Sequence, residues 1–150
     1  MIAYHYTTAA NARLIRASGR ILPATAHVGP EEAPVVWFSS ETTWEPTASK
    51  AVVDIRSGYC RTLTFPEMVK VQVARFGVDT SLLVPWNALK KESGMTDDTA
   101  SALARAGRRQ GANPRNWYGY FGVLDLSEIQ TQEQYGPGGW VPTGGGVWTL

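Results

Sequence analysis

Three short segments, far apart in the chain, carry residue types that can hold a ligand and act on it. They supply an imidazole, flat aromatic rings, hydroxyl groups and one carboxylate, in His5, Tyr6 and Thr7, in Trp37, Phe38 and Ser39, and in Glu133. Imidazole and hydroxyl groups orient a ligand by hydrogen bonding, an aromatic ring stacks on a planar group, and a carboxylate stabilises developing positive charge. The three segments can act together only where the fold brings them to one cleft.

Several other kinds of site have no counterpart in the sequence. The chain lacks the P-loop pattern, a G-x-G-x-x-G after a strand and an H-E-x-x-H helix. Its two histidines, His5 and His27, are too few and too isolated for a metal site, so we expect no metal. The single cysteine, Cys60, excludes an internal disulfide and a cysteine-rich metal site, and nothing around it activates a thiol.

The length and composition favour one domain. A chain of 150 residues, 43% of them hydrophobic, can bury one core, and we expect a single domain over 1–142 with a flexible tail at 143–150. No stretch approaches the roughly 20 apolar residues that span a bilayer, and the N-terminus lacks a signal-peptide pattern. With one cysteine, these features favour a cytoplasmic protein without a membrane partner. The net charge is +1, but 61–115 holds nine Lys or Arg against five Asp or Glu.

The elements that must position the three segments are predicted from periodicity. Strands are expected at 2–7, 34–40, 61–65, 68–76 and 127–135, with 119–123 as a strand or the approach to one and 140–142 as a hairpin partner. Helices are expected at 9–18, 85–92 and 97–110, the first capped by Thr7 or Thr8 and ended by Gly19. The pattern predicts an α+β fold with a largely antiparallel or mixed sheet and helices inserted between N- and C-terminal strands.

The three segments together resemble the His–aromatic–Glu branch of the ADP-ribosyltransferase superfamily. That branch includes poly-ADP-ribose polymerases, tRNA 2′-phosphotransferases and DNA-modifying toxins of the DarT type. Its H-x-T tripeptide is matched by His5, Tyr6 and Thr7, and the helix and S-G-x-I turn that follow are most similar to the DarT-type toxins. Its buried strand ending in an aromatic residue is matched with Trp37 or Phe38 in place of the usual tyrosine. Its late glutamate is matched by Glu133.

The resemblance implies an ADP-ribosyltransferase-like fold that uses NAD as substrate. It implies catalytic roles for Glu133 and His5, and transfer of ADP-ribose to an unknown acceptor, either a nucleic acid or a protein, as in a bacterial or phage toxin with an antitoxin or immunity partner. The residues that it implies for NAD binding are His5, Tyr6, Thr7, Trp37, Phe38 and Ser39, with Trp44 beside the cleft and Arg13, or alternatively Arg16, Arg20 or Lys50, at the phosphates.

Each of these residues also has a structural interpretation. His5 can be a hydrogen-bonded structural histidine, and Glu133 a polar residue on an exposed strand. Trp37 and Phe38 are neighbours on a strand, so they face opposite sides and at least one of them is expected to pack in the core. Two alternative functions follow: an inactive relative that binds a nucleotide or a protein partner, and a small nucleic-acid-binding protein that uses the basic stretch 105–115.

Overall fold

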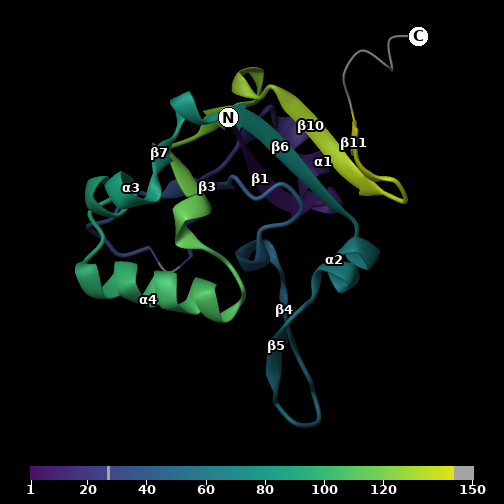
Figure 1. The fold of residues 1–150 in the computed structure, drawn as a ribbon, viewed down its shortest axis with the longest axis horizontal. Coiled ribbons are helices and arrows are strands. Elements are labelled where there is room, and N and C mark those ends of the chain that lie inside the picture. The colour runs from purple at the N-terminus through teal and green to yellow at the C-terminus, as the bar shows by residue number, and fades with distance from the viewer. Residues whose placement is uncertain (27, 144–150) are drawn as a thin grey trace.

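A computed structural model describes residues 1–26 and 28–143 and is organised around one seven-stranded sheet (Figure 1). The strand order is β11-β10-β6-β1-β3-β8-β7, and every pair is antiparallel. The strands are β1 Ile2–Thr8, β3 Val35–Ser39, β6 Val73–Asp79, β7 Val84–Pro85, β8 Trp117–Phe121, β10 Thr131–Gly136 and β11 Gly139–Pro142. The chain therefore has the predicted α+β class, with an antiparallel rather than a mixed sheet.

The N-terminal unit follows the sequence closely. Helix α1, Ala9–Ser18, begins where the Thr8 side chain accepts a hydrogen bond from the Asn11 amide, and it ends at Gly19, whose φ of 77° is left-handed. A side chain at Gly19 would be strained in this conformation, which explains why the helix stops there. The predicted cap and stop are both confirmed. A two-stranded sheet of β2 Arg20–Ile21 and β9 Leu124–Asp125 lies next along the chain.

The two faces of the large sheet are covered by different helices. On one face, α1 packs on a core that includes Ala3, Phe38 and Phe76. On the other face, α3 Trp86–Glu92 and α4 Asp97–Arg109 cover a cluster that includes Val35 and Trp117. Strand alternation explains this division, because neighbouring residues of one strand point to opposite faces. The side chains of β3 are therefore shared between these two clusters, whereas those of β1 are shared between the α1 cluster and a third one that includes Tyr6, Trp44 and Met68.

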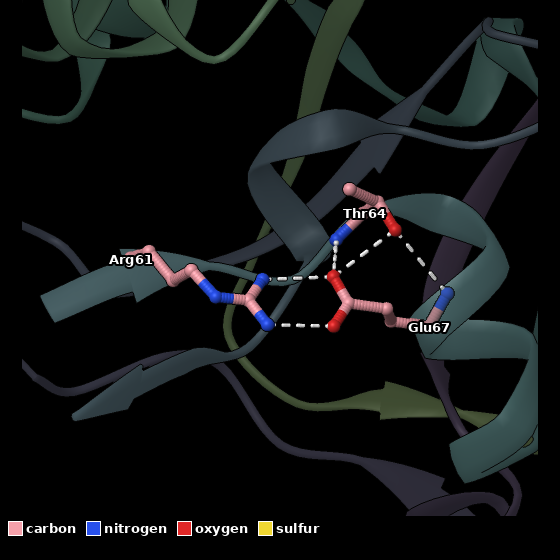
Figure 2. A network of polar contacts seen from close by, with 3 residues as sticks. All are labelled: Arg61, Thr64 and Glu67. Carbon is pink, nitrogen blue, oxygen red and sulfur yellow. Dashed lines mark hydrogen bonds and ion pairs between the residues drawn. The ribbon is translucent and has the colours of Figure 1, made fainter. Parts of the chain in front are cut away.

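The strand predicted over 68–76 is wrong in its first half, which forms helix α2, Phe65–Val71. Figure 2 shows the cause: Thr64 and Glu67 form a capping box, in which the Thr64 hydroxyl accepts from the Glu67 amide and the Glu67 carboxylate accepts from the Thr64 amide at 3.0 Å. Arg61 adds two hydrogen bonds to the same carboxylate. This cap outweighs the apolar alternation of 68–71. The helix ends at Gln72, at a φ of 77°, before β6 begins.

A hairpin of β4 Ala51–Val53 and β5 Cys60–Thr62 stands away from the large sheet (Figure 1). The strand predicted over 61–65 is therefore confirmed only at its start, since Thr64 caps α2. The hairpin pairs only with itself. No strand was predicted for 51–53, where the apolar stretch is too short to show a period.

Four 3-10 turns connect the remaining elements: η1 Pro46–Ala48, η2 Thr80–Leu82, η3 Pro114–Asn116 and η4 Leu126–Glu128. The last of these occupies the start of the strand predicted over 127–135, so β10 begins at Thr131. Of the tail predicted over 143–150, positions 144–150 lie outside the described residues. The Thr143 amide donates to the Gln132 carbonyl at 2.8 Å. No helix of the described part combines the length and apolar character that crossing a membrane requires.

Candidate functional site

A cavity of about 380 Å³ opens on the face of the sheet that α4 covers. Its lining comes from β1, β3, η1, α4 and the start of β8. The lining is rich in aromatic side chains. Among the described residues that form it, Glu45 is the one acid and there is no lysine or arginine. A cavity with apolar walls and a few polar groups is the usual form of a small-molecule site.

The cavity lies where β1 and β3 stop pairing. These two strands are in register at only one pair, Tyr4 with Ser39, whereas β1 and β6 are paired at seven positions from Ile2 to Thr8. Past that pair, the His5 ring takes up a position against β3, with Nδ1 2.9 Å from the Trp37 carbonyl oxygen. The neighbours of His5 on the strand, Tyr4 and Tyr6, point to the α4 face, and His5 does not. The opening between the two strands nevertheless gives His5 access to the cavity.

The hydrogen bond of His5 defines its chemistry. A carbonyl oxygen only accepts, so Nδ1 must carry the proton and donate it. Burial of the ring lowers the pKa of His5 from 6.5, and the bond to the Trp37 carbonyl raises it only in part. His5 is therefore a neutral imidazole near pH 7 whose Nε2 is a hydrogen-bond acceptor. No residue of the described chain bonds to Nε2.

Of the two adjacent aromatic residues, Trp37 is the one whose ring lies on the cavity side. Phe38 is only 2% exposed and packs in the core under α1, with its ring centroid 5.8 Å from that of His5. The Trp37 ring meets Trp117 edge-on, at 6.4 Å between centroids. Gly107 of α4 keeps this wall open, since a Cβ there would lie 2.5 Å from the Trp117 ring.

The floor of the cavity carries a buried carboxylate that the sequence reasoning did not single out. Glu45 is 6% exposed, and its Oε1 accepts from the Ser39 hydroxyl at 2.8 Å. Its Oε2 accepts from the Thr47 amide at 3.1 Å and from the Thr47 hydroxyl at 2.5 Å. The signal in the sequence was the Glu-Pro pair at 45–46, since a carboxylate before proline is suited to cap a short helical turn.

Tyr6 also lines the cavity, but its hydroxyl is engaged elsewhere. The hydroxyl donates to the Glu41 carbonyl and receives a hydrogen bond from Arg75 Nη1 at 3.3 Å. Burial raises the pKa of Tyr6 to about 12, against a smaller lowering by Arg75. Tyr6 is therefore a neutral wall residue, and its hydroxyl proton is not available to a ligand.

The structure separates Glu133 from the cavity. In the sheet register Glu133 lies opposite Arg75, which lies opposite Tyr6, so Glu133 is on the same face as Tyr6 but one strand further from the cavity, with Arg75 in between. Its Oε1 is 2.8 Å from Arg75 Nε, and the Arg75 guanidinium is held over the Tyr4 ring at 3.8 Å. Arg75 is 7% exposed, so the two charges neutralise each other in a largely dry environment. Glu133 does not line the cavity.

Three other residues implied for NAD binding also lie outside the cavity lining. The Thr7 hydroxyl accepts from the Asn11 side chain at 2.7 Å. Arg13 is exposed on α1. Trp44 is buried, stacks on Phe65 at 5.5 Å and donates to the Ser49 hydroxyl. The residues that the structure does bring together are those of the first two segments: His5, Tyr6, Trp37, Phe38 and Ser39.

Among the described residues, no group of three or more His, Cys, Asp or Glu side chains is placed to hold a metal ion. Comparisons of the chain with protein-family models, curated proteins and solved structures found no match. Function is therefore inferred from the geometry of this cavity and from the residues that line it.

Proposed function

We propose that the cavity binds the nicotinamide end of NAD and that the protein is an ADP-ribosyltransferase. The observation that carries the proposal is the opening between β1 and β3, because a neutral, acceptor-bearing His5 and Trp37 line the same cavity there. These two residues belong to the two segments through which the sequence resembles the superfamily. In this proposal, both residues contact the same ligand.

The size and polarity of the cavity support a planar heterocycle with an attached sugar. Its volume of about 380 Å³ lies toward the lower end of the range for small-molecule sites, roughly 300–1,000 Å³. This volume suits one end of a dinucleotide. With no lysine or arginine in the lining, the phosphates belong outside, in solvent or against basic residues beyond the mouth.

Each cavity residue then has a defined task. His5 Nε2 accepts a hydrogen bond from a ribose hydroxyl and orients the sugar without transferring a proton. The Trp37 ring lies over the nicotinamide, which adds roughly 1 kcal/mol beyond its buried area, by analogy with aromatic pairs. Orientation of this kind lowers the barrier, because the reacting bond is held in position before reaction.

The acceptor of ADP-ribose approaches the mouth of the cavity in this proposal. The lining residue Gln110 directly follows the last turn of α4, where Arg108 and Arg109 are exposed. Positive charge at that place attracts a polyanion. This favours a nucleic acid over a protein as the acceptor, as in a toxin that modifies nucleic acid.

A second function is supported by one specific contact. Because Arg75 neutralises Glu133, the carboxylate implied by the resemblance is not free to stabilise a cationic sugar. A relative that binds the nucleotide without turnover is consistent with this contact. Binding and nicotinamide release must therefore be measured separately.

Thermal unfolding with and without NAD tests the binding half of the proposal. NAD at 100 times its dissociation constant stabilises a folded protein by about 2.7 kcal/mol. We expect such a shift for the wild type and a smaller one for Trp37→Leu. Trp140→Leu is the matched control, because Trp140 packs over Arg75 and does not line the cavity. Equal shifts in all three proteins, or none in the wild type, contradict the proposed site.

A further inference from the structure

We propose that Glu45, and not Glu133, is the catalytic carboxylate that opposes the positive charge of the reacting ribose. This inference rests on the proposed function, since it assigns a role within the same cavity. It departs from the late-strand glutamate implied by the resemblance, and it follows from where the two carboxylates lie.

The first reason is position. Glu45 is the acid in the cavity lining, and its hydrogen-bond partners Ser39 and Thr47 line the same cavity. Ser39 is also the β3 residue paired with Tyr4, at the point where β1 and β3 separate. The carboxylate is thus fixed to the edge of the opening that gives His5 access. Glu133 lies beyond Tyr6 and Arg75 in the sheet.

The second reason is charge. Glu133 forms a 2.8 Å ion pair with Arg75, whereas no cationic side chain of the described residues pairs with Glu45. The donors to Glu45 are two hydroxyls and one amide, which are neutral. They orient the carboxylate and bring no positive charge to it. In a cavity with apolar walls, that charge acts on a ligand far more strongly than it would in water.

The third reason is preorganisation. Both carboxylate oxygens are held by hydrogen bonds, and the side chain is 6% exposed. A group already fixed toward developing charge needs no rearrangement during the reaction. Capping of η1 explains the hydrogen bonds from Thr47. It does not require the hydrogen bond from Ser39, which holds Oε1 at the wall of the cavity.

The step is the cleavage of the bond between ribose C1′ and the nicotinamide nitrogen. The electron pair of that bond goes to the nitrogen, which loses its positive charge and leaves as neutral nicotinamide. The positive charge passes to the ribose, where the Glu45 carboxylate opposes it. An oxygen of the acceptor, or of water in the hydrolytic side reaction, then bonds to C1′ and gives its proton to solvent.

The test measures nicotinamide released from NAD, with water as acceptor, by the folded full-length protein. We expect Glu45→Gln to lower the release rate on the order of 10²–10³-fold, with the NAD-induced rise in melting temperature retained. Glu45→Asp keeps the charge, so it should lose less than Glu45→Gln. Glu128→Gln, on the exposed turn η4, is the matched control for the substitution itself.

Several outcomes overturn the role of Glu45. These are a Glu45→Gln rate within about threefold of the wild type, equal losses in Glu45→Gln and Glu45→Asp, or a loss confined to Glu133→Gln. Circular dichroism at the assay temperature shows whether each variant is folded. If Glu45→Gln is unfolded, the release rate of Glu45→Asp is compared with that of the wild type instead. A wild type that does not bind NAD contradicts the proposed function itself, whereas one that binds NAD without releasing nicotinamide contradicts the transfer reaction and this role.

Discussion

His5 shows how one hydrogen bond determines what a side chain can do. The Trp37 carbonyl fixes the proton on Nδ1, and burial keeps the ring neutral, so Nε2 is left as a hydrogen-bond acceptor. The same two features that suit the residue to hold a sugar hydroxyl also couple its protonation to folding.

The pH dependence of stability tests the state of His5. Its pKa in the folded protein is below the value of 6.5 expected for the unfolded chain. The unfolded chain therefore binds a proton first as the pH falls. The stabilisation is complete above about pH 6.5 and is lost as the pH falls toward the folded pKa. Urea unfolding of the wild type should show this decline, and His5→Gln should show less of it. Parallel curves for the two proteins rule out a buried, neutral His5.

Arg75 and Glu133 are expected to serve the fold. Replacing Arg75 by methionine leaves the Glu133 carboxylate, 18% exposed, without its partner. We expect Arg75→Met to lower the free energy of unfolding by about 3 kcal/mol, the lower part of the range for breaking a buried pair. The double variant Arg75→Met/Glu133→Gln should recover part of this loss in denaturant unfolding. A double variant as unstable as the sum of the single ones indicates that the two charges are not coupled.

At the scale of elements, α4 determines the shape of the cavity. Its residues Gly107 and Gln110 belong to the lining, and the Gln110 side chain also reaches Thr62 at the base of the hairpin, at 3.4 Å. The helix is strongly amphipathic, and its small residues, Ala100, Ala104 and Gly107, face the sheet. They let the helix approach Trp117 closely.

Gly107→Ala separates this packing role from helix propensity. Alanine in place of glycine inside a helix stabilises by about 1 kcal/mol where there is room. Here the new Cβ meets the Trp117 ring at 2.5 Å. We expect a lower melting temperature and weaker binding of NAD. Ser101→Ala, on the exposed side of α4, is the control and should gain a few tenths of a kcal/mol. A Gly107→Ala protein more stable than the wild type contradicts the packing described.

The elements also show which parts of the fold the sequence could predict. β1, α1, β3 and α4 were predictable because each has a clear period and, for both helices, a capping residue. The alternating apolar residues of α2 predict a strand, and the capping box of Thr64 and Glu67 outweighs that pattern in the structure. For the site, short motifs singled out His5 and Trp37, and both residues line the cavity. Glu45 was not singled out, because the Glu-Pro pair at 45–46 indicates only a cap for a short turn, whereas its place in the cavity comes from the contact with Ser39.

At the scale of the whole molecule, the hairpin β4–β5 is separate from the cores that hold the site. Its residues are exposed almost throughout, including Ile55 at 98%, and none of them belongs to a hydrophobic cluster. Replacing 53–60 with an Asn-Gly turn keeps Arg61 and its contact with Glu67, so unfolding should stay cooperative and the NAD-induced shift intact, as measured by calorimetry. Loss of the cooperative unfolding transition would show instead that the hairpin supports the large sheet.

The position of NAD relative to the tryptophan rings tests the proposed nicotinamide site most directly. In a ¹H–¹⁵N spectrum, each indole N–H gives a resolved signal that individual substitutions assign. Saturating NAD should shift the signals of Trp37 and Trp117, which line the cavity, and leave that of Trp140 unchanged, since its N–H donates to the Thr43 carbonyl elsewhere on the sheet. Shifts confined to Trp140, or no shift at Trp37, contradict a nicotinamide site between β1 and β3.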